Sequence, residues 1–207
     1  MTLPENFEAW VRLLTLLPIL FCSIVGSAVT IAKWLQFRRA RRSGERFIEL
    51  VRGLDSGGDY GPALAMARAD GSIPARLVEY ALASVGAPRT RLVDQIEHGG
   101  RQLARTVEQG LDTVALIATL GPLLGLFGTV VGIVIVFEQL AGAEGVVSPS
   151  QLAGGIGTAL YTTVAGLIVG MCALVSHRFL ASRADDVVAQ LETLGHALAD
   201  FAGGHDA

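Results

Sequence analysis

The segment Gly155–Leu167, GIGTALYTTVAGL, lies inside a run without a charged side chain that extends from Gly145 to Ser176. Its length fits a bilayer crossing, because a hydrocarbon core of ~30 Å needs about 20 apolar residues in a helix. Glycines and threonines nevertheless recur through it, and these residues are typical of helix faces that contact protein rather than lipid. The segment therefore predicts a membrane helix with one face directed to protein or water.

Two further runs lack charge, Leu13–Ala32 and Thr113–Phe137. Hydrophobic residues make up 51% of the chain and charged residues 17%, which is below the roughly 25% of average globular proteins. A buried core helix of a soluble protein is the alternative for any one run, but three such runs in 207 residues disfavour it. Each span must be helical, because lipid offers no hydrogen-bond partner to backbone groups.

Basic residues near the ends of the spans predict the topology. Lys33 and the arginines of RRARR (38–42) follow the first run, where a cleaved signal peptide would have small residues, so we expect that span to be retained. We expect a bacterial inner-membrane protein with a periplasmic N-terminus and a cytoplasmic C-terminus. The predicted segments are a periplasmic N-terminus (1–12), span one (13–35), a cytoplasmic helical segment (36–112), span two (113–138), a periplasmic loop (139–152), span three (153–177) and a cytoplasmic C-terminal helix (178–207).

The segments between and after the spans also have helical patterns, so the predicted fold class is all-α. Turn residues delimit helices at about 38–54, 63–69 and 74–85. From Arg89 we expect one long helix that continues into span two. After span three, an apolar stripe predicts an amphipathic extension of that span into the cytoplasm; the stripe consists of Val187, Val188, Leu191, Leu194 and Leu198.

Spans two and three each carry a face of small residues, which lets helix backbones approach closely in lipid. The candidate packing residues are Gly121, Gly125, Gly128 and Gly132 in span two, and Gly155, Gly166 and Gly170 in span three. Helix packing alone is one interpretation of these faces, and a pore or partner-helix surface is the other. Pro122 predicts a kink in span two.

The segments GPLLGLFGTVVGIVIVF (121–137) and GIGTALYTTVAGL (155–167) resemble the MotA/TolQ/ExbB proton channel family, and the three-span topology favours its ExbB/TolQ branch. The resemblance implies a pentamer in which spans two and three line a pore. It also implies a single-span partner of the ExbD/TolR type, which supplies an intramembrane aspartate. Thr129 and Thr163 match the family's pore threonines, and we expect Thr158 and Thr162 to lie along the same proton path.

The chain departs from the family at one position, because Thr158 stands where ExbB and TolQ have a glutamate. No acidic or basic residue remains within the three uncharged runs, although intramembrane acids usually mark function. Hydroxyls and a carboxylate from the partner would remain to move protons.

Other functional classes find less support. A non-conducting oligomeric membrane scaffold is the main alternative. We expect no enzymatic activity, cofactor or metal, since no nucleotide loop, metal-ligand cluster or Ser-His-acid set is present. The net charge of −3 gives no reason to expect nucleic acid as a partner.

Overall fold

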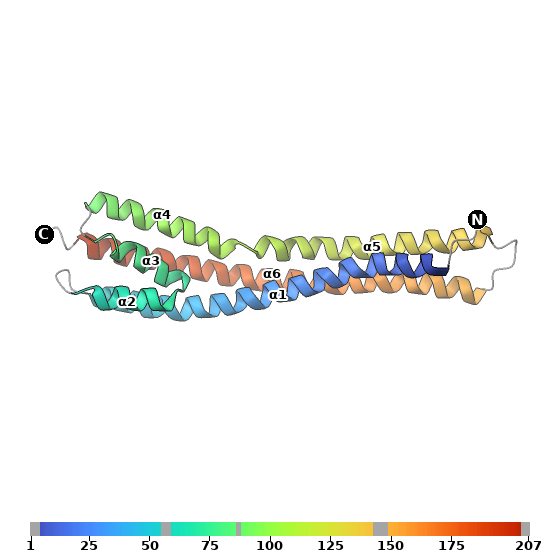
Figure 1. Cartoon of the computed structure of the whole chain (residues 1–207), viewed down its shortest axis with the longest axis horizontal. Coiled ribbons are helices and arrows are strands. Elements are labelled where there is room, and N and C mark those ends of the chain that lie inside the picture. Colours follow the sequence, from blue (N-terminus) through green and yellow to red (C-terminus); the bar gives the residue numbers. More distant parts are fainter. Residues whose placement is uncertain (1–4, 55–58, 86–87, 143–148, 204–207) are drawn as a thin grey trace. The chain divides into compact units, whose positions relative to one another are not determined.

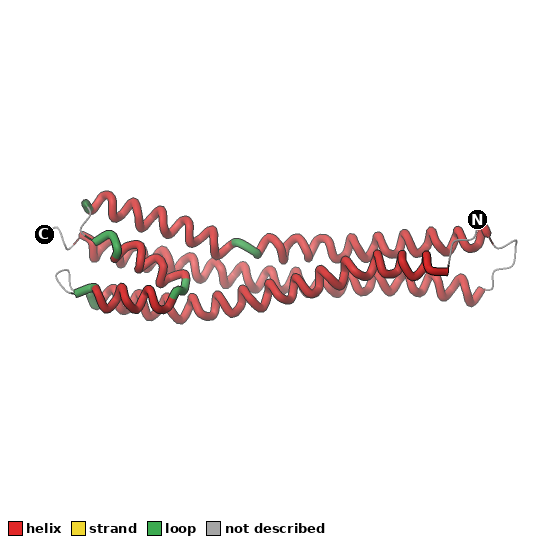
Figure 2. Tube along the Cα trace, in the orientation of Figure 1, coloured by secondary structure: helices red, strands yellow, loops and turns green. Residues whose placement is uncertain are grey.

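The computed structural model describes residues 5–54, 59–85, 88–142 and 149–203. These residues form six α-helices and no strand (Figures 1 and 2). The helices are α1 (Glu5–Arg52), α2 (Gly61–Asp70), α3 (Ile73–Leu82), α4 (Arg89–Glu108), α5 (Leu111–Gly142) and α6 (Pro149–Gly203). The all-α prediction is thereby confirmed.

The chain divides into two compact units, and the long helices α1 and α6 contribute to both. The first, which we call the apolar unit, consists of Met1–Thr30 and Asp112–Arg178. The second, which we call the charged unit, consists of Ile31–Leu111 and Phe179–Ala207. The membrane boundaries predicted above fall near these divisions and stay predictions.

The charged unit has its own hydrophobic core, to which every helix in the unit contributes. The stripe predicted after span three belongs to this core: Leu194 and Leu198 are almost fully buried, and Val188 is partly buried against it. On α1, Phe47 is 1% exposed. Burying an apolar side chain of this size stabilises a fold by about 1.5–3 kcal/mol, so the core holds the unit together.

The corner between α2 and α3 is formed by residues 70–72. Gly71 has φ of +63°, a left-handed conformation that ends α2, and Ser72 then caps α3 by accepting a hydrogen bond from the Ala75 backbone N–H. The Asp70 carboxylate accepts hydrogen bonds from the Ser72 N–H and the Ser43 hydroxyl, at 3.1 and 3.0 Å. Asp70 therefore connects the corner to α1.

The expectation of one continuous helix from Arg89 into span two is wrong. α4 ends at Glu108 and α5 begins at Leu111, because Gly110 adopts φ of +89°, which a right-handed helix excludes. The break leaves carbonyls at the end of α4 without a helical partner. The Lys33 ammonium donates to two of them, those of Thr106 and Val107, at 3.2 Å each.

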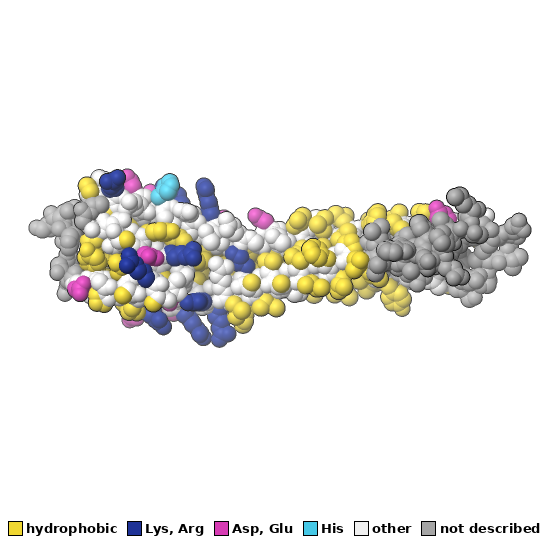
Figure 3. Space-filling model, in the orientation of Figure 1, with side chains coloured by type: hydrophobic (Ala, Val, Ile, Leu, Met, Phe, Trp, Pro, Cys, Tyr) yellow, Lys and Arg dark blue, Asp and Glu magenta, His cyan; other side chains and the backbone are white. Residues whose placement is uncertain are grey.

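The apolar unit exposes many large hydrophobic side chains. Phe21, Leu126 and Phe137 are each more than half exposed, and Figure 3 shows hydrophobic side chains over the described helices of this unit. Three helical segments of the described residues are long and apolar enough to cross a membrane: Leu16–Arg52, Thr90–Glu138 and Ala153–Phe201. A chain with such helices is a multi-pass membrane protein, since lipid takes the place of a core around them.

Candidate functional site: the glycine and threonine contact of α5 and α6

The glycine stripes of α5 and α6 lie against each other. A Cβ atom added at Gly121 would lie 2.9 Å from the Gly166 carbonyl oxygen, and one added at Gly125 would lie 3.0 Å from the Thr163 Cα. The first separation is shorter than real Cβ atoms show and the second is tighter than most of them, so the two backbones are in direct contact here. The remaining predicted packing glycines also lie in the α5–α6 contact: Gly128, Gly132, Gly155, Gly166 and Gly170.

Pro122 lies inside α5 and faces this contact. A Cβ added at Gly170 would lie 2.8 Å from the Pro122 Cγ and 3.1 Å from the Ala118 carbonyl oxygen. Because proline has no N–H, that carbonyl loses its helical partner. The predicted kink stays a prediction, but its cause lies at the interface of the two helices.

Three threonine hydroxyls surround one backbone carbonyl at the centre of the contact. The Gly125 carbonyl oxygen lies 3.0 Å from the Thr163 hydroxyl, 3.3 Å from that of Thr129 and 3.5 Å from that of Thr162. Thr129 and Thr163 also contact each other through their hydroxyl oxygens. We call these three residues and this carbonyl the hydroxyl cluster.

Each hydroxyl has one proton but more than one acceptor within reach. The Thr129 hydroxyl can donate to Gly125, to Thr163 or to the Ala159 carbonyl at 3.4 Å. If Thr129 donates to Thr163, then Thr163 donates to the Gly125 carbonyl. If instead Thr163 donates to Thr129, then Thr129 donates to the carbonyl of Gly125 or Ala159. The pair can therefore reverse its polarity by hydroxyl rotation alone.

The four predicted path residues do not occupy equivalent places. Thr129 and Thr163 are partly buried, whereas Thr162 is 7% exposed and donates to the Ala159 carbonyl at 2.7 Å. Thr158 donates to the Gly154 carbonyl of its own helix at 2.9 Å. Within the described residues, no hydrogen bond joins Thr158 to the hydroxyl cluster. The roles of all four in a proton path stay predictions.

The chemistry of the cluster is limited by its residue types. A hydroxyl donates and accepts hydrogen bonds but does not hold an extra proton at neutral pH. No group of His, Cys, Asp and Glu side chains among the described residues has an arrangement that could bind a metal ion. The site can orient water or a charged guest, and the uncharged runs contain no Asp, Glu, His, Lys or Arg that could carry the proton.

Sequence reasoning identified the threonines but missed the Gly125 carbonyl as their shared acceptor. Thr129 stands four residues after Gly125, the spacing at which a threonine hydroxyl reaches back to its own helix. The two threonines of α6 reach the same oxygen because Gly125 carries no side chain to hold that helix away. A glycine opposite a Thr-Thr pair was the available signal.

Comparison with known proteins identifies the family. A family model described as the MotA/TolQ/ExbB proton channel family matches residues 69–193, which is more than half of the chain. The match includes α5, most of α6 and the whole hydroxyl cluster.

Several curated proteins are similar to part of the chain. Biopolymer transport protein exbB1 of Vibrio cholerae is 42% identical over 83 residues, which are 40% of this chain and 36% of that protein. Biopolymer transport protein ExbB of Neisseria gonorrhoeae is 36% identical over 107 residues, 52% of this chain and 48% of that protein. A putative ExbB homologue of Methanothermobacter thermautotrophicus is 36% identical over 86 residues, 42% and 30% respectively. The chain spans about half or less of the length of these relatives.

Proposed function

The chain belongs to the MotA/TolQ/ExbB proton channel family, and we propose that it is the channel subunit of an ExbB/TolQ-type complex that couples the proton motive force to envelope transport or mechanical work. The observation that carries the proposal is the hydroxyl cluster, in which Thr129 and Thr163 contact each other beside the Gly125 carbonyl. Polar groups placed between two membrane helices, without a titrating side chain, suit a site that receives its charge from elsewhere.

We propose that the proton carrier is an aspartate on a single-span partner. A proton does not cross hydrocarbon as a bare ion, so it needs a carrier whose charge change is stabilised by nearby dipoles. Hydroxyl donors stabilise the carboxylate form, and hydroxyl acceptors stabilise the carboxylic acid. Because Thr129 and Thr163 can exchange donor and acceptor roles, they would serve both forms at one depth in the membrane.

We further propose that copies of the chain form a closed ring around the partner, a pentamer by analogy with the family, in a bacterial inner membrane. A ring follows from a heterologous interface that closes on itself. In this arrangement the N-terminus is periplasmic and the charged unit is cytoplasmic, where the basic residues that follow spans one and three place it.

Proton flux into liposomes tests this function. We expect the purified chain alone to be nearly proton-tight, and we expect flux when a single-span partner with an intramembrane aspartate is reconstituted with it. The same partner with that aspartate replaced by asparagine should restore the tight state. Equal flux with and without the partner would contradict a carrier supplied in trans, and no flux in any combination would favour a non-conducting scaffold.

A further inference from the structure

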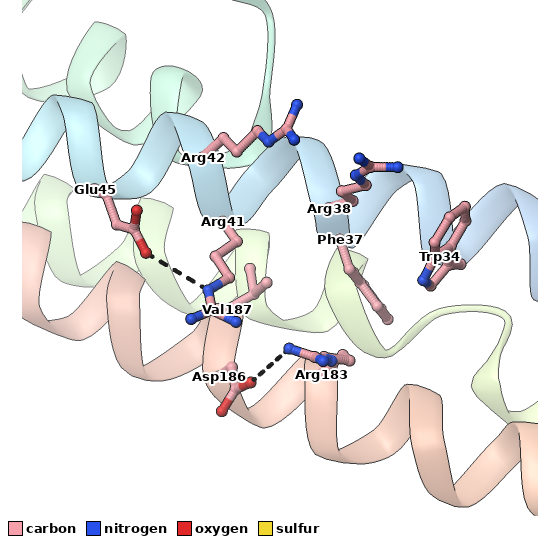
Figure 4. Close-up of a pocket in the computed structure, with 9 residues that line it drawn as sticks. All are labelled: Trp34, Phe37, Arg38, Arg41, Arg42, Glu45, Arg183, Asp186 and Val187. Atoms are coloured by element: carbon pink, nitrogen blue, oxygen red, sulfur yellow. Dashed lines mark ion pairs between the residues drawn. The ribbon is translucent and has the colours of Figure 1, made fainter.

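A groove of about 420 Å³ lies within the charged unit between α1 and α6 (Figure 4). Trp34, Arg38, Arg41 and Arg42 of α1 and Arg183 of α6 are among its lining residues. In Figure 4, Arg41 points from α1 toward Arg183, while Arg38 and Arg42 lie next to each other at the other edge of α1. Four arginines therefore line this groove, and nothing in the proposed proton path uses them.

The groove has more positive than negative charge. Its two carboxylates, Glu45 and Asp186, make single contacts to Arg41 and Arg183 at 3.5 and 3.8 Å, and all four side chains are at least 40% exposed. Exposed ion pairs of this kind are weak. Arg38 and Arg42 form no ion pair with any residue that the structure describes. Two fork-shaped donors are thus available for an anion, which guanidinium groups bind in bidentate fashion.

The residues of α1 that precede these arginines place the groove beside the hydrocarbon. Ile31, Trp34 and Leu35 are 58%, 42% and 53% exposed, so this turn of α1 presents apolar side chains outward immediately before the arginines begin. The Arg38 guanidinium lies over the Trp34 ring, 5.5 Å from its centroid. Tryptophan beside arginine is typical of the level at which lipid head groups lie.

We propose that this groove binds the phosphate of an anionic phospholipid in the leaflet that borders the charged unit. Arg38 and Arg42 bind the phosphate, Arg41 and Arg183 add positive charge, and the acyl chains lie along the apolar surface at Ile31 and Leu35. A basic pocket that continues into an apolar membrane-facing surface fits a lipid better than it fits a free anion. The inference requires only that α1 enters a membrane, and it is independent of proton conduction.

Trp34 makes the groove measurable, because Trp10 is the only other tryptophan and is replaced in a Trp10→Phe background. The protein is placed in phosphatidylcholine vesicles that contain increasing fractions of bromine-labelled phosphatidylglycerol or, separately, bromine-labelled phosphatidylcholine. Bromine quenches tryptophan on contact, so the two curves give the binding preference for the anionic lipid at Trp34. We expect a clear preference, which falls by about fivefold for each arginine lost in Arg38→Gln with Arg42→Gln.

The matched control is Arg46→Gln with Arg52→Gln, which removes the same charge from exposed positions of the same helix outside the groove. It should leave the preference unchanged, and an equal fall in both variants would reduce the effect to general electrostatic attraction and overturn the site. Arg38→Lys with Arg42→Lys should keep most of the preference. If it loses as much as the glutamine variant, the arginines act through the fold rather than by charge.

A last arm distinguishes a lipid from a soluble anion. Inorganic phosphate, added at an ionic strength matched with sodium chloride, should relieve the quenching no more than chloride does. Greater relief by phosphate would show that the groove is a soluble-phosphate site and would overturn the proposal.

Discussion

At the scale of single residues, the absence of a side chain at Gly166 sets the distance between α5 and α6. A Cβ at this position would lie 2.7 Å from the Gly125 Cα and 2.8 Å from the Gly125 nitrogen, and neither backbone atom can move aside without moving its helix. The hydroxyl cluster depends on this approach, because Thr162 and Thr163 reach the Gly125 carbonyl across it.

We therefore predict that Gly166→Ala destabilises the protein by about 1–3 kcal/mol, the usual cost of forcing extra volume into close packing. Gly157→Ala is the matched control, since a Cβ there meets nothing within 4 Å and alanine is favoured over glycine in a helix. The measurement is the thermal unfolding midpoint of each variant in mild detergent. A Gly166→Ala protein as stable as Gly157→Ala would show that the helices are not in contact at this point.

The threonines illustrate how far sequence reasoning reaches at this scale. Residue type and spacing placed Thr129 and Thr163 on small-residue faces, and these residues do lie together in the structure. Sequence reasoning could not predict that Thr162 is buried in the contact while Thr158 bonds only to its own helix, because this difference depends on the rotation of α6 against α5 rather than on any local pattern.

At the scale of elements, the separation of α4 from α5 depends on one glycine. Gly110 has φ of +89°, which costs a residue with a side chain about 1–2 kcal/mol. The continuous helix expected from Arg89 contains Gly99, Gly100 and Gly110, and only the third breaks it. The reason is tertiary: the carbonyls exposed by the break accept hydrogen bonds from the Lys33 ammonium of α1, and no local pattern on α4 indicates that partner.

We predict that Gly110→Ala lowers the free energy of unfolding by about 1 kcal/mol or more, whereas Gly100→Ala raises it by about 0.5–1 kcal/mol. A Cβ at Gly100 meets nothing within 4 Å and its backbone is helical. Gly100→Ala is therefore the control, because it is the same substitution at a position without a strained backbone. Denaturant unfolding of both variants in detergent checks the signs. Stabilisation by both substitutions would show that α4 and α5 tolerate a continuous helix.

The α2–α3 corner predicts a pH dependence. Burial raises the pKa of Asp70. Hydrogen bonds from Ser72 and Ser43 and the positive charge of Arg39 together lower this pKa by more than burial raises it, so it lies below the ordinary carboxyl value. A lowered folded-state pKa gives stability that is present above the unfolded value of about 4 and is lost as the pH falls through the folded value.

The acid loss of stability should therefore be smaller in Asp70→Asn, which keeps a hydrogen-bonding side chain but removes the charge. Asp185→Asn is the control, since this exposed carboxylate forms no ion pair in the described part of the chain. The readout is the unfolding midpoint of each variant between neutral pH and about pH 3. Identical pH profiles for Asp70→Asn and the parent protein would contradict the role of Asp70 at the corner.

At the scale of the whole molecule, the uncharged runs predicted three spans, and three helices are long and apolar enough to provide them. The orientation of these spans in the membrane is predicted from the distribution of basic residues, because the fold alone does not reveal it. With Cys22 and Cys172 replaced, we predict that Ala141→Cys reacts with an impermeant thiol reagent in intact cells and that Ser182→Cys does not. Both positions are exposed, so accessibility in the folded chain is matched. Reaction of Ser182→Cys alone would reverse the topology.

The central claim is that the paired hydroxyls of Thr129 and Thr163 serve a proton carrier supplied by a partner. The most direct test is proton flux through liposomes that contain the reconstituted complex, with both threonines replaced by valine, which keeps their shape. Loss of a hydrogen bond to a charged group costs about 1.5–3 kcal/mol, so we expect flux to fall tenfold or more while assembly is retained. Thr119→Val, at an exposed threonine of α5 that bonds only to its own helix, should conduct normally. Undiminished flux in the assembled Thr129→Val, Thr163→Val complex would contradict the account.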